Sequence, residues 1–490
     1  MKDAQYSRPS VLRDSVRVAC TLLMMFLGVA CRAGDIDAIQ ALINSGEFKK
    51  AETHIAGALA QSSLSPADRE ALSYERERMR RMALDFSLTA EEAQERLKRQ
   101  IPDLTPAEFA AWDQAGLLER LTIDGRTLYF NRAPSNLFRL SEDARKRRGK
   151  STPPWTDGPM EVANAHHREV RDQALATGKH SAAPRRVRVT YSLNVNPDAV
   201  PDGETVRAWL PFPRAIPGHQ ENLLLVASTP SQHTLAPESA LQRTVYLENV
   251  ARKSKPTEFS ITYELTIFGQ YHAIDGAKVK PARRSAELAE FLAERPPHIV
   301  FTDGIRRFSR EVVGAEKNPY RIAQMLFDAV DRIPWAGARE YSTITNLSEY
   351  TLNAGHGDCG QQTLLLMTLL RLNGIPTRWQ SGWVYSEGDY DNMHDWAQLY
   401  LAPYGWVPMD VTFGRLQSGD PQIDAFYLGG LDAYRIAFND DFSRPFRPAK
   451  QHFRSDTVDS QRGEVEWRGG NLYFDQWDYE FRAQVLATPK

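Results

Sequence analysis

The chain has 490 residues, with 60 lysines and arginines against 62 aspartates and glutamates, so its formal net charge is −2. This balance excludes a strongly basic chain, and we expect no nucleic-acid partner. The length predicts several domains, and a hydrophobic content of 42% is ample for packed cores.

The N-terminus has the pattern of an export signal. Basic residues precede an apolar run at 18–30, which is too short to span a bilayer comfortably. Residues 27–31, Leu-Gly-Val-Ala-Cys, resemble a bacterial lipoprotein box with its leucine one place further from the cysteine than usual. Either Cys31 carries a lipid that tethers the protein to a membrane, or a peptidase cuts near Ala33 and releases it. We expect residues 1–33 to be a signal peptide and the mature protein to lie in the cell envelope or periplasm.

Residues 34–180 are predicted to form a helical region with a small winged-helix-like module. Apolar periodicity, capping-box starts and a turn predict a series of helices and then a hairpin, at residues 35–43, 50–59, 66 onward, 87–92 onward, 104–108 onward and 123–130. In an exported chain of balanced charge, we expect this module to pack on the rest of the protein or to present substrate, and not to bind DNA.

From residue 186 the pattern changes to the alternation of β-strands. Five short strands are predicted, at residues 187–193, 206–210, 223–226, 244–247 and 258–265. This spacing is typical of a β-sandwich, which we place at 185–275 with a structural or substrate-positioning role. Residues 426–490 contain further aromatic and acidic strands, and we expect them to form a C-terminal β extension that packs on the core.

The cysteines give the first indication of chemistry. The chain has three, and Cys359 is the one that lies outside the N-terminal stretch that carries Cys20 and Cys31. Exported proteins usually avoid cysteine or pair it, because their surroundings are oxidising. A single remaining thiol therefore suggests a reactive group, although a buried, inert cysteine is the plain alternative.

The position of Cys359 favours the reactive interpretation. The segment 361–372 is rich in leucine and methionine, and Asn373, Gly374 and Pro376 mark its end, so it reads as a helix with Cys359 at its N-terminus. The partial positive charge at that end stabilises a thiolate and predicts a lowered thiol pKa. The free backbone N–H groups there can also hold an oxyanion.

A cysteine nucleophile needs a base, and the base needs an orienting group. Residues 391–401 and 406–411 read as two strands joined by a turn at 403–405, and this hairpin brings His394 and Asp410 toward the same end of the ladder. Each residue alone is more typical of a polar surface or a turn. Their order after the cysteine, on successive strands of one hairpin, favours a catalytic set.

This order resembles the transglutaminase-like superfamily of papain-type thiol enzymes. The motifs that carry the resemblance span roughly residues 320–415 and are Gly357-Asp358-Cys359-Gly360, Leu370 to Arg378, Gly382-Trp383-Val384, His394-Asp395-Trp396-Ala397 and Tyr404 to Thr412. The resemblance implies a papain-like core at 285–425, with Cys359 as nucleophile, His394 as general base and acid, and Asp410 as the group that orients the imidazole.

The resemblance also completes the expected fold class, which is α+β and multidomain. The strands at 185–275 are similar to the immunoglobulin-like domain often found ahead of the catalytic core in this superfamily. The expected order is therefore a signal peptide, a helical region, an immunoglobulin-like β-sandwich, the transglutaminase-like core and the C-terminal β extension.

One residue departs from the pattern of the superfamily. Asp395 follows the catalytic histidine, where many relatives carry a small residue. Its carboxylate either favours the charged imidazole of His394 or faces solvent on the opposite face of the strand. We expect the second arrangement.

The resemblance names a site more firmly than a reaction. Members of the superfamily cross-link proteins, cleave peptides or amides, or release peptides from glycans, and all begin with thiolate attack on an amide to give an acyl-enzyme. Whether water or an amine then takes the acyl group depends on pocket shape, which the sequence does not reveal. We expect hydrolysis of peptide or isopeptide bonds in a peptide or protein substrate. Protein-glutamine cross-linking, or a non-catalytic binding protein on a degenerate core, are the alternatives.

Two further features are weaker. Trp383, Trp396 and Trp406 could line a substrate groove, although aromatic residues at such spacing are more often core. The acidic loop around Asp389 has no calcium-loop pattern, and no cysteine and histidine spacing indicates zinc. We therefore expect no metal and no cofactor.

Overall fold

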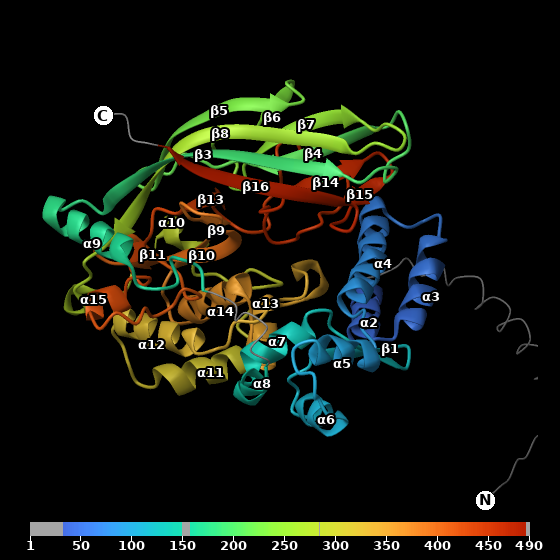
Figure 1. The fold of residues 1–490 in the computed structure, drawn as a ribbon, viewed down its shortest axis with the longest axis horizontal. Coiled ribbons are helices and arrows are strands. Elements are labelled where there is room, and N and C mark those ends of the chain that lie inside the picture. Colours follow the sequence, from blue (N-terminus) through green and yellow to red (C-terminus); the bar gives the residue numbers. More distant parts are fainter. Residues whose placement is uncertain (1–32, 149–156, 284, 487–490) are drawn as a thin grey trace, which may run out of the picture. The chain divides into compact units, whose positions relative to one another are not determined.

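The structure is a computed structural model that describes residues 33–148, 157–283 and 285–486 (Figure 1). The chain divides into two compact units, one from residues up to 83 together with 121–128, and the other from 84–120 together with 129 onward. The expected signal peptide and the Cys31 lipidation site lie outside the described residues. Within these ranges, no helix is both long and apolar enough to cross a membrane.

The first unit is helical. It contains α2 (Ala33–Asn44), α3 (Phe48–Leu59) and most of α4 (Pro66–Asp85). Apolar residues spaced four apart, such as Ile39 and Ile43, are buried in a small core of their own, as an amphipathic pattern requires. Gly46 joins α2 to α3 with a φ of +81°, and a Cβ there would lie 2.0 Å from the Thr122 carbonyl oxygen. Glycine is therefore needed at this turn.

The second unit begins with short helices, which in the sequence precede and follow a hairpin whose residues 121–128 belong to the first unit. Thr89 and Thr105 form the predicted capping boxes with Glu92 and Glu108. The elements up to residue 177 are α5 (Ala90–Lys98), α6 (Pro106–Gln114), β1 (Arg120–Ile123), β2 (Arg126–Tyr129), α7 (Ala133–Leu140), α8 (Glu142–Arg147) and α9 (Ala165–Thr177).

Two five-stranded sheets follow, and their buried residues join one continuous core. One has the order β12-β8-β3-β16 with β5 on β8, and the other β15-β14-β4-β7-β6. Their strands are β3 (Ser181–Val195), β4 (Thr205–Pro211), β5 (Gln220–Thr229), β6 (His233–Leu235), β7 (Thr244–Val250), β8 (Thr257–Tyr271), β12 (Gly430–Leu431), β14 (Glu464–Trp467), β15 (Gly470–Leu472) and β16 (Trp477–Leu486). The five strands expected from alternation are present as β3, β4, β5, β7 and β8. The C-terminal strands join the same sheets: β14 pairs with β4, and β16 pairs with β3 along its whole length.

A four-stranded sheet and a group of helices complete this unit. The sheet has the order β11-β10-β9-β13, with β9 (Thr377–Tyr385), β10 (Asp391–Leu401), β11 (Gly405–Met409) and β13 (Arg435–Asn439). The helices are α10 (Ala286–Ala289), α11 (Asp303–Val313), α12 (Pro319–Asp331), α13 (Leu347–Ala354), α14 (Cys359–Leu372) and α15 (Pro421–Asp424), with 3-10 turns η1 (Gly276–Lys278) and η2 (Tyr341–Thr343).

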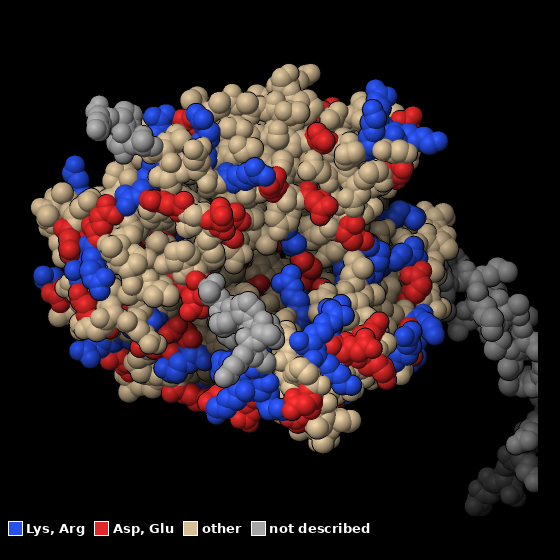
Figure 2. All heavy atoms as spheres, viewed as in Figure 1, with Lys and Arg blue, Asp and Glu red and all other residues tan. Residues whose placement is uncertain are grey.

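Helix α14 is the centre of this arrangement. Residues 360–371 are buried without exception, so the helix is enclosed on all sides between the sheet and the other helices, as its uniform leucine and methionine content requires. The predicted helix and the predicted hairpin of β10 and β11 are both present. On the face shown in Figure 2, acidic and basic residues are intermixed, as expected from the balanced charge.

Candidate active site

Cys359 is the first residue of α14, as the sequence predicts. Asp358 caps the helix and forms a capping box with Gln361, which fixes the backbone around the thiol. The side chain is partly exposed, and its Sγ donates to Asp395 Oδ2 at 3.2 Å. A Cβ at Gly360 would lie 2.2 Å from the Tyr341 hydroxyl oxygen and 2.8 Å from Asp395 Oδ2, so the residue after Cys359 must be small.

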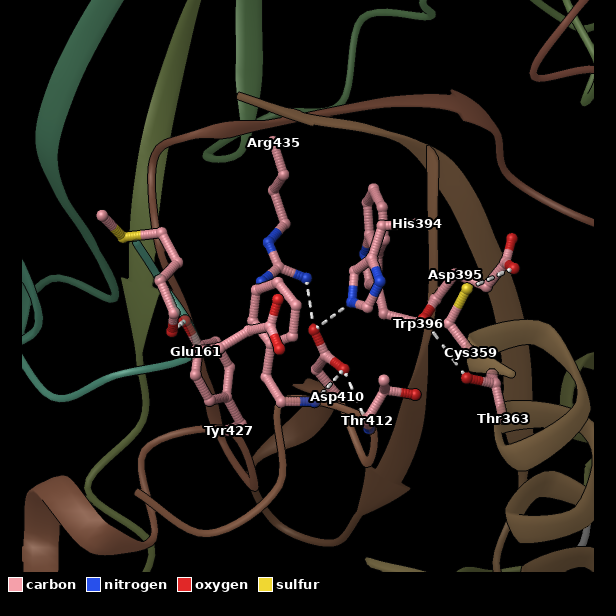
Figure 3. Close-up of polar contacts among 12 residues, drawn as sticks. Glu161, Cys359, Thr363, His394, Asp395, Trp396, Asp410, Thr412, Tyr427 and Arg435 are labelled. Carbon is pink, nitrogen blue, oxygen red and sulfur yellow. Dashed lines mark hydrogen bonds and ion pairs between the residues drawn. The ribbon is translucent and has the colours of Figure 1, made fainter. Parts of the chain in front are cut away.

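His394 and Asp410 lie in direct contact. The imidazole Nε2 is 2.7 Å from Asp410 Oδ2, and both side chains are buried. The register of β10 and β11 pairs Ala397 with Met409, so residues just before and just after these positions meet at the open end of the hairpin. Because Asp410 occupies Nε2, the other nitrogen, Nδ1, is left for the thiol. Figure 3 shows the imidazole between the Asp410 carboxylate and the Cys359 sulfur.

A buried arginine holds Asp410 from the other side. Arg435 Nη1 lies 2.8 Å from Asp410 Oδ2, and its Nη2 lies 2.5 Å from Asp432 Oδ2. The Asp410 Oδ1 accepts from the backbone N–H groups of Thr412 and Phe413, each at 3.1 Å. Burial would raise the pKa of Asp410, but His394, Arg435 and these hydrogen bonds hold it below its usual value. Asp410 is therefore an ionised carboxylate that fixes the imidazole.

Aromatic rings enclose this group of charges. The Phe413 ring stacks on the imidazole at a centroid distance of 4.3 Å. The Arg435 guanidinium lies over the rings of Trp396, Phe413 and Tyr427 at 5.0, 5.0 and 5.5 Å. The rings exclude water and allow the arginine to remain charged while fully buried.

Asp395 does not face solvent, and that expectation was wrong. Its side chain is 1% exposed and points toward α14, where Oδ2 lies against the Cys359 sulfur. The alternation of the strand does separate it from His394, but residues 394–399 of β10 are all buried, so both faces of the strand are covered here. Gln461 holds the Asp395 carboxyl group from the other side. Its Nε2 donates to Asp395 Oδ1 and to the His394 carbonyl oxygen, each at 2.9 Å.

Further acids lie behind Asp395. Asp459 is completely buried beside the Asp395 carboxyl group, and Asp456 lies close to Asp459. Burial and the proximity of Asp459 raise the pKa of Asp395 well above its usual value, and burial likewise raises the pKa of Asp459. The Tyr341 hydroxyl donates to Asp358 at 2.7 Å and lies 3.4 Å from Asp395 Oδ2.

This environment reverses the expected direction for the thiol. Loss of solvent around the sulfur raises the pKa of Cys359 well above its usual value, and the Asp395 and Asp358 carboxylates raise it further. A hydrogen bond from the Asp395 backbone acts in the opposite direction. The helix N-terminus predicted a lowered pKa, and that prediction was wrong because the sulfur is desolvated and Asp395 touches it, neither of which a short-range pattern reveals.

Cys359, His394 and Asp395 line a cavity of about 400 Å³, and Asp410 lies behind His394, outside the lining. Charged residues of both signs line it as well, including Arg132, Arg139 and Glu161. A second cavity of about 660 Å³ has Asn392, Met393 and Arg462 in common with the first and is lined by aromatic residues. The two cavities therefore adjoin at the start of β10.

The three tryptophans considered for substrate binding have different places. Trp383 lines the second cavity and stacks on Phe481 at 4.5 Å. Trp396 is fully buried, and its indole N–H donates to Gln380 Oε1 at 3.0 Å. Trp406 packs on Phe291 at 5.0 Å, with the Arg378 guanidinium 4.6 Å from its ring.

The acidic loop before β10 is occupied by contacts within the protein. Glu387 accepts from the Tyr434 hydroxyl at 2.6 Å. Among residues 33–148, 157–283 and 285–486, no three histidines, cysteines, aspartates or glutamates are grouped so that they could hold a metal ion.

Comparison with known proteins agrees with this geometry. Residues 306–411 match the model of the transglutaminase-like superfamily. The chain therefore contains a transglutaminase-like domain. The matched segment includes Cys359, His394 and Asp410 but ends before Arg435. A search of curated proteins finds no match.

Solved structures align with this chain at low identity and with TM-scores below 0.5. A candidate cysteine protease from Cytophaga hutchinsonii is 15% identical, with 63% of this chain and 93% of that chain covered and a TM-score of 0.42. The periplasmic domain of TgpA from Pseudomonas aeruginosa, bound to ethylmercury, is 12% identical, with 46% and 94% covered and a TM-score of 0.23. A candidate protease from Parabacteroides distasonis is 10% identical, with 53% and 68% covered and a TM-score of 0.18. None of these likenesses carries a statement about the reaction of this chain.

Several residues of the site were missed from the sequence. Arg435 and Asp432 come 22 or more positions after Asp410, Gln461 and Asp459 lie in the loop before β14, and Tyr341 lies in η2. None belongs to a motif with a chemical signature. The one available signal was the carboxylate at Asp395, which a buried strand position leaves in need of partners.

Proposed function

We propose that this protein is a thiol enzyme that cleaves peptide or isopeptide amide bonds through a Cys359 acyl-enzyme. One observation carries the proposal. The 2.7 Å contact between His394 and Asp410 orients an imidazole in the cavity that the Cys359 sulfur also lines. An oriented base beside a thiol at a helix N-terminus is the arrangement that thiolate attack requires.

The steps follow from these positions. His394 Nδ1 takes the thiol proton, and the Cys359 thiolate attacks the amide carbon. The backbone N–H of Cys359, which has no acceptor within its own helix, stabilises the oxyanion. The imidazolium then protonates the leaving amine, and Asp410 holds the imidazole in place and stabilises its charged form. Water activated by His394 hydrolyses the thioester and restores the thiol.

We also propose that the protein acts outside the cytoplasm, on peptides of the cell envelope or on foreign polypeptides. The apolar run at 18–30 and the residues around Cys31 support this placement. Fractionation of cells that produce the natural protein and a Cys31→Ala variant tests the anchor. Lipid attachment predicts a membrane-bound natural protein and a released variant, whereas cleavage near Ala33 predicts that both are released.

The activity is tested with a pool of peptides and cell-wall fragments and a labelled primary amine, followed by mass spectrometry. The purified protein is compared with a Cys359→Ala variant whose folding is checked by circular dichroism. Amide cleavage that the variant lacks supports a hydrolase, and amine incorporation would make the protein a transglutaminase. Equal turnover by the variant would remove Cys359 from the mechanism.

A further inference from the structure

We infer that Asp395 acts as a carboxylic acid beside the Cys359 sulfur, that the buried pair of Asp395 and Asp459 holds one proton, and that the nucleophile is competent only while this acid pair retains it. The inference rests on the proposed function, because it concerns the same thiol. It assigns a role in that chemistry to a carboxyl group that lies outside the set of Cys359, His394 and Asp410.

The contact between Asp395 and the sulfur is direct. Asp395 Oδ2 lies 3.2 Å from Cys359 Sγ, while its other oxygen, Oδ1, already accepts from Gln461 Nε2 at 2.9 Å. Gln461 also binds the His394 carbonyl oxygen, so the amide fixes the carboxyl group relative to the strand that carries the base. The oxygen that faces the sulfur is therefore held in place by the protein.

The contact between the two acids requires a proton. Asp395 and Asp459 are 1% and 0% exposed, and their carboxyl groups lie beside each other. A carboxylate only accepts hydrogen bonds, so two carboxyl groups can bond to each other only if one of them is protonated. Like charges in a shared buried site favour the same state, since both acids cannot easily be ionised together.

The surrounding groups do not neutralise Asp395 by an ion pair. Those that face it are Asp358 at the N-cap of α14, Cys359 of α14, Tyr341 of η2, Ser381 of β9, His394 of β10, and Asp456, Asp459 and Arg462 of the loop before β14. The cation in this set, Arg462, is paired with Glu340 at 2.6 Å. Arg454 approaches the loop as well, and it donates to the Asp459 backbone carbonyl oxygen and to Gln242. The contacts of Asp395 itself are therefore neutral groups and other acids.

The proton decides what Asp395 does to the nucleophile. When the thiol proton moves to His394, the single proton of the pair lies on Asp395, which donates it in a hydrogen bond to the negative sulfur, and Asp459 is then the ionised member of the pair. When the pair has lost its proton, a carboxylate lies 3.2 Å from the sulfur and opposes formation of the thiolate. Since burial and Asp459 raise the pKa of Asp395, the protonated form persists above the pH at which an ordinary aspartate ionises, and is lost as the pH rises further.

The test measures the rate of Cys359 alkylation by iodoacetamide from pH 5 to pH 9 in the full chain and in two variants. In Asp395→Asn, the amide oxygen can still accept from Gln461 and the amide N–H can donate to the sulfur, but the group does not titrate. We expect its rate to equal that of the natural protein near pH 5 and to exceed it by about tenfold near pH 9, the equivalent of one pKa unit of the thiol.

The second variant is Asp459→Asn, which leaves Asp395 in place but removes the acid that shares its proton. Asp395 then ionises at lower pH. The alkylation rate of Asp459→Asn should therefore begin to fall below that of Asp395→Asn at a lower pH than the rate of the natural protein does. This shift is a readout that a merely structural role would not move. Thermal unfolding of each variant establishes that it is folded before the rates are compared.

The outcomes separate the inference from the function. A constant ratio between Asp395→Asn and the natural protein at every pH would make Asp395 structural and overturn the inference, while the thiol enzyme would stand. If Asp395→Asn is alkylated faster than the natural protein already at pH 5, Asp395 is ionised over the whole pH range. That result would also overturn the inference and leave the thiol enzyme standing. A thiol that does not react in any of the three proteins would overturn the proposed function, and the inference with it.

Discussion

Arg435 and Asp410 form an ion pair in which neither side chain is exposed, with Nη1 2.8 Å from Oδ2. The same carboxylate oxygen binds the His394 imidazole. The arginine therefore does two things: it compensates a charge that could not otherwise be buried, and it fixes the carboxylate that in turn fixes the base.

Replacing Arg435 by methionine should destabilise the protein strongly. Asp410 and Asp432 would lose their shared cation inside the core, and breaking a buried pair in this way costs roughly 3–5 kcal/mol of unfolding free energy. Arg415→Met provides the control, because its pair with Asp328 at 2.7 Å is partly exposed and such pairs contribute about 0–1 kcal/mol. Urea denaturation measures both, and similar losses for the two variants would contradict this account.

Removing the imidazole should slow the thiol. In His394→Ala no base remains to take the Cys359 proton, so alkylation by iodoacetamide near pH 7 should fall by at least about tenfold. His54→Ala, at an exposed position on α3, is the control and should alkylate at the natural rate. If His394→Ala is alkylated as fast as the natural protein, His394 is not the partner of Cys359.

The close packing after the nucleophile should make Gly360 intolerant of a side chain. A Cβ there meets the Tyr341 hydroxyl oxygen at 2.2 Å and Asp395 Oδ2 at 2.8 Å, so Gly360→Ala must displace one of them, at a cost of about 1–3 kcal/mol in unfolding free energy. Gly57→Ala is matched to it, because it also lies within a helix but has no atom within 4 Å. Alanine should stabilise that helix by roughly 0.5–1 kcal/mol. Effects of the same sign would show that Tyr341 and Asp395 yield without cost.

The acid pair should make stability depend on pH. The pKa of Asp459 is raised by burial in the folded protein, so the folded state holds more protons than the unfolded state above the ordinary aspartate pKa of about 3.9, and this contribution to stability is lost as the pH rises. Asp459→Asn removes the titration. We expect the variant to gain unfolding free energy relative to the natural protein between pH 5 and pH 8, as measured by urea denaturation at both pH values. If the unfolding free energies of the two proteins change equally between pH 5 and pH 8, Asp459 is already ionised at both pH values in the folded protein.

The sequence was sufficient where the chemistry is local. Glycines around Cys359, a leucine-rich helix and a turn at 403–405 are short-range signals, and they placed the thiol and the hairpin of His394 and Asp410 correctly in space. The C-terminal strands could be recognised as strands for the same reason.

What could not be predicted depends on contacts between distant segments. Strand alternation correctly put Asp395 on the face opposite His394, but whether that face is wet depends on where α14 and the loop before β14 lie. Arg435 lies 25 positions from Asp410 on another strand, and a lone arginine in a β-strand carries no sign of its partner. The pairing of β16 with β3 joins segments almost 300 positions apart, and alternation alone gives no register between them.

The contacts of Gln461 with His394 and Asp395 determine which fragments of this protein can be expressed with an intact site. The segment that family comparison recognises ends at residue 411, yet the amide that holds His394 and Asp395 comes 50 positions later, from a stretch whose flanking strands belong to the two large sheets. An expression clone trimmed to the recognised segment would expose the buried faces of α14 and β10 and would lack the Gln461 amide that binds His394 and Asp395. The smallest piece worth producing therefore runs from Leu84, where the second unit begins, to the end of β16, because Arg132, Arg139 and Glu161 also line the cavity.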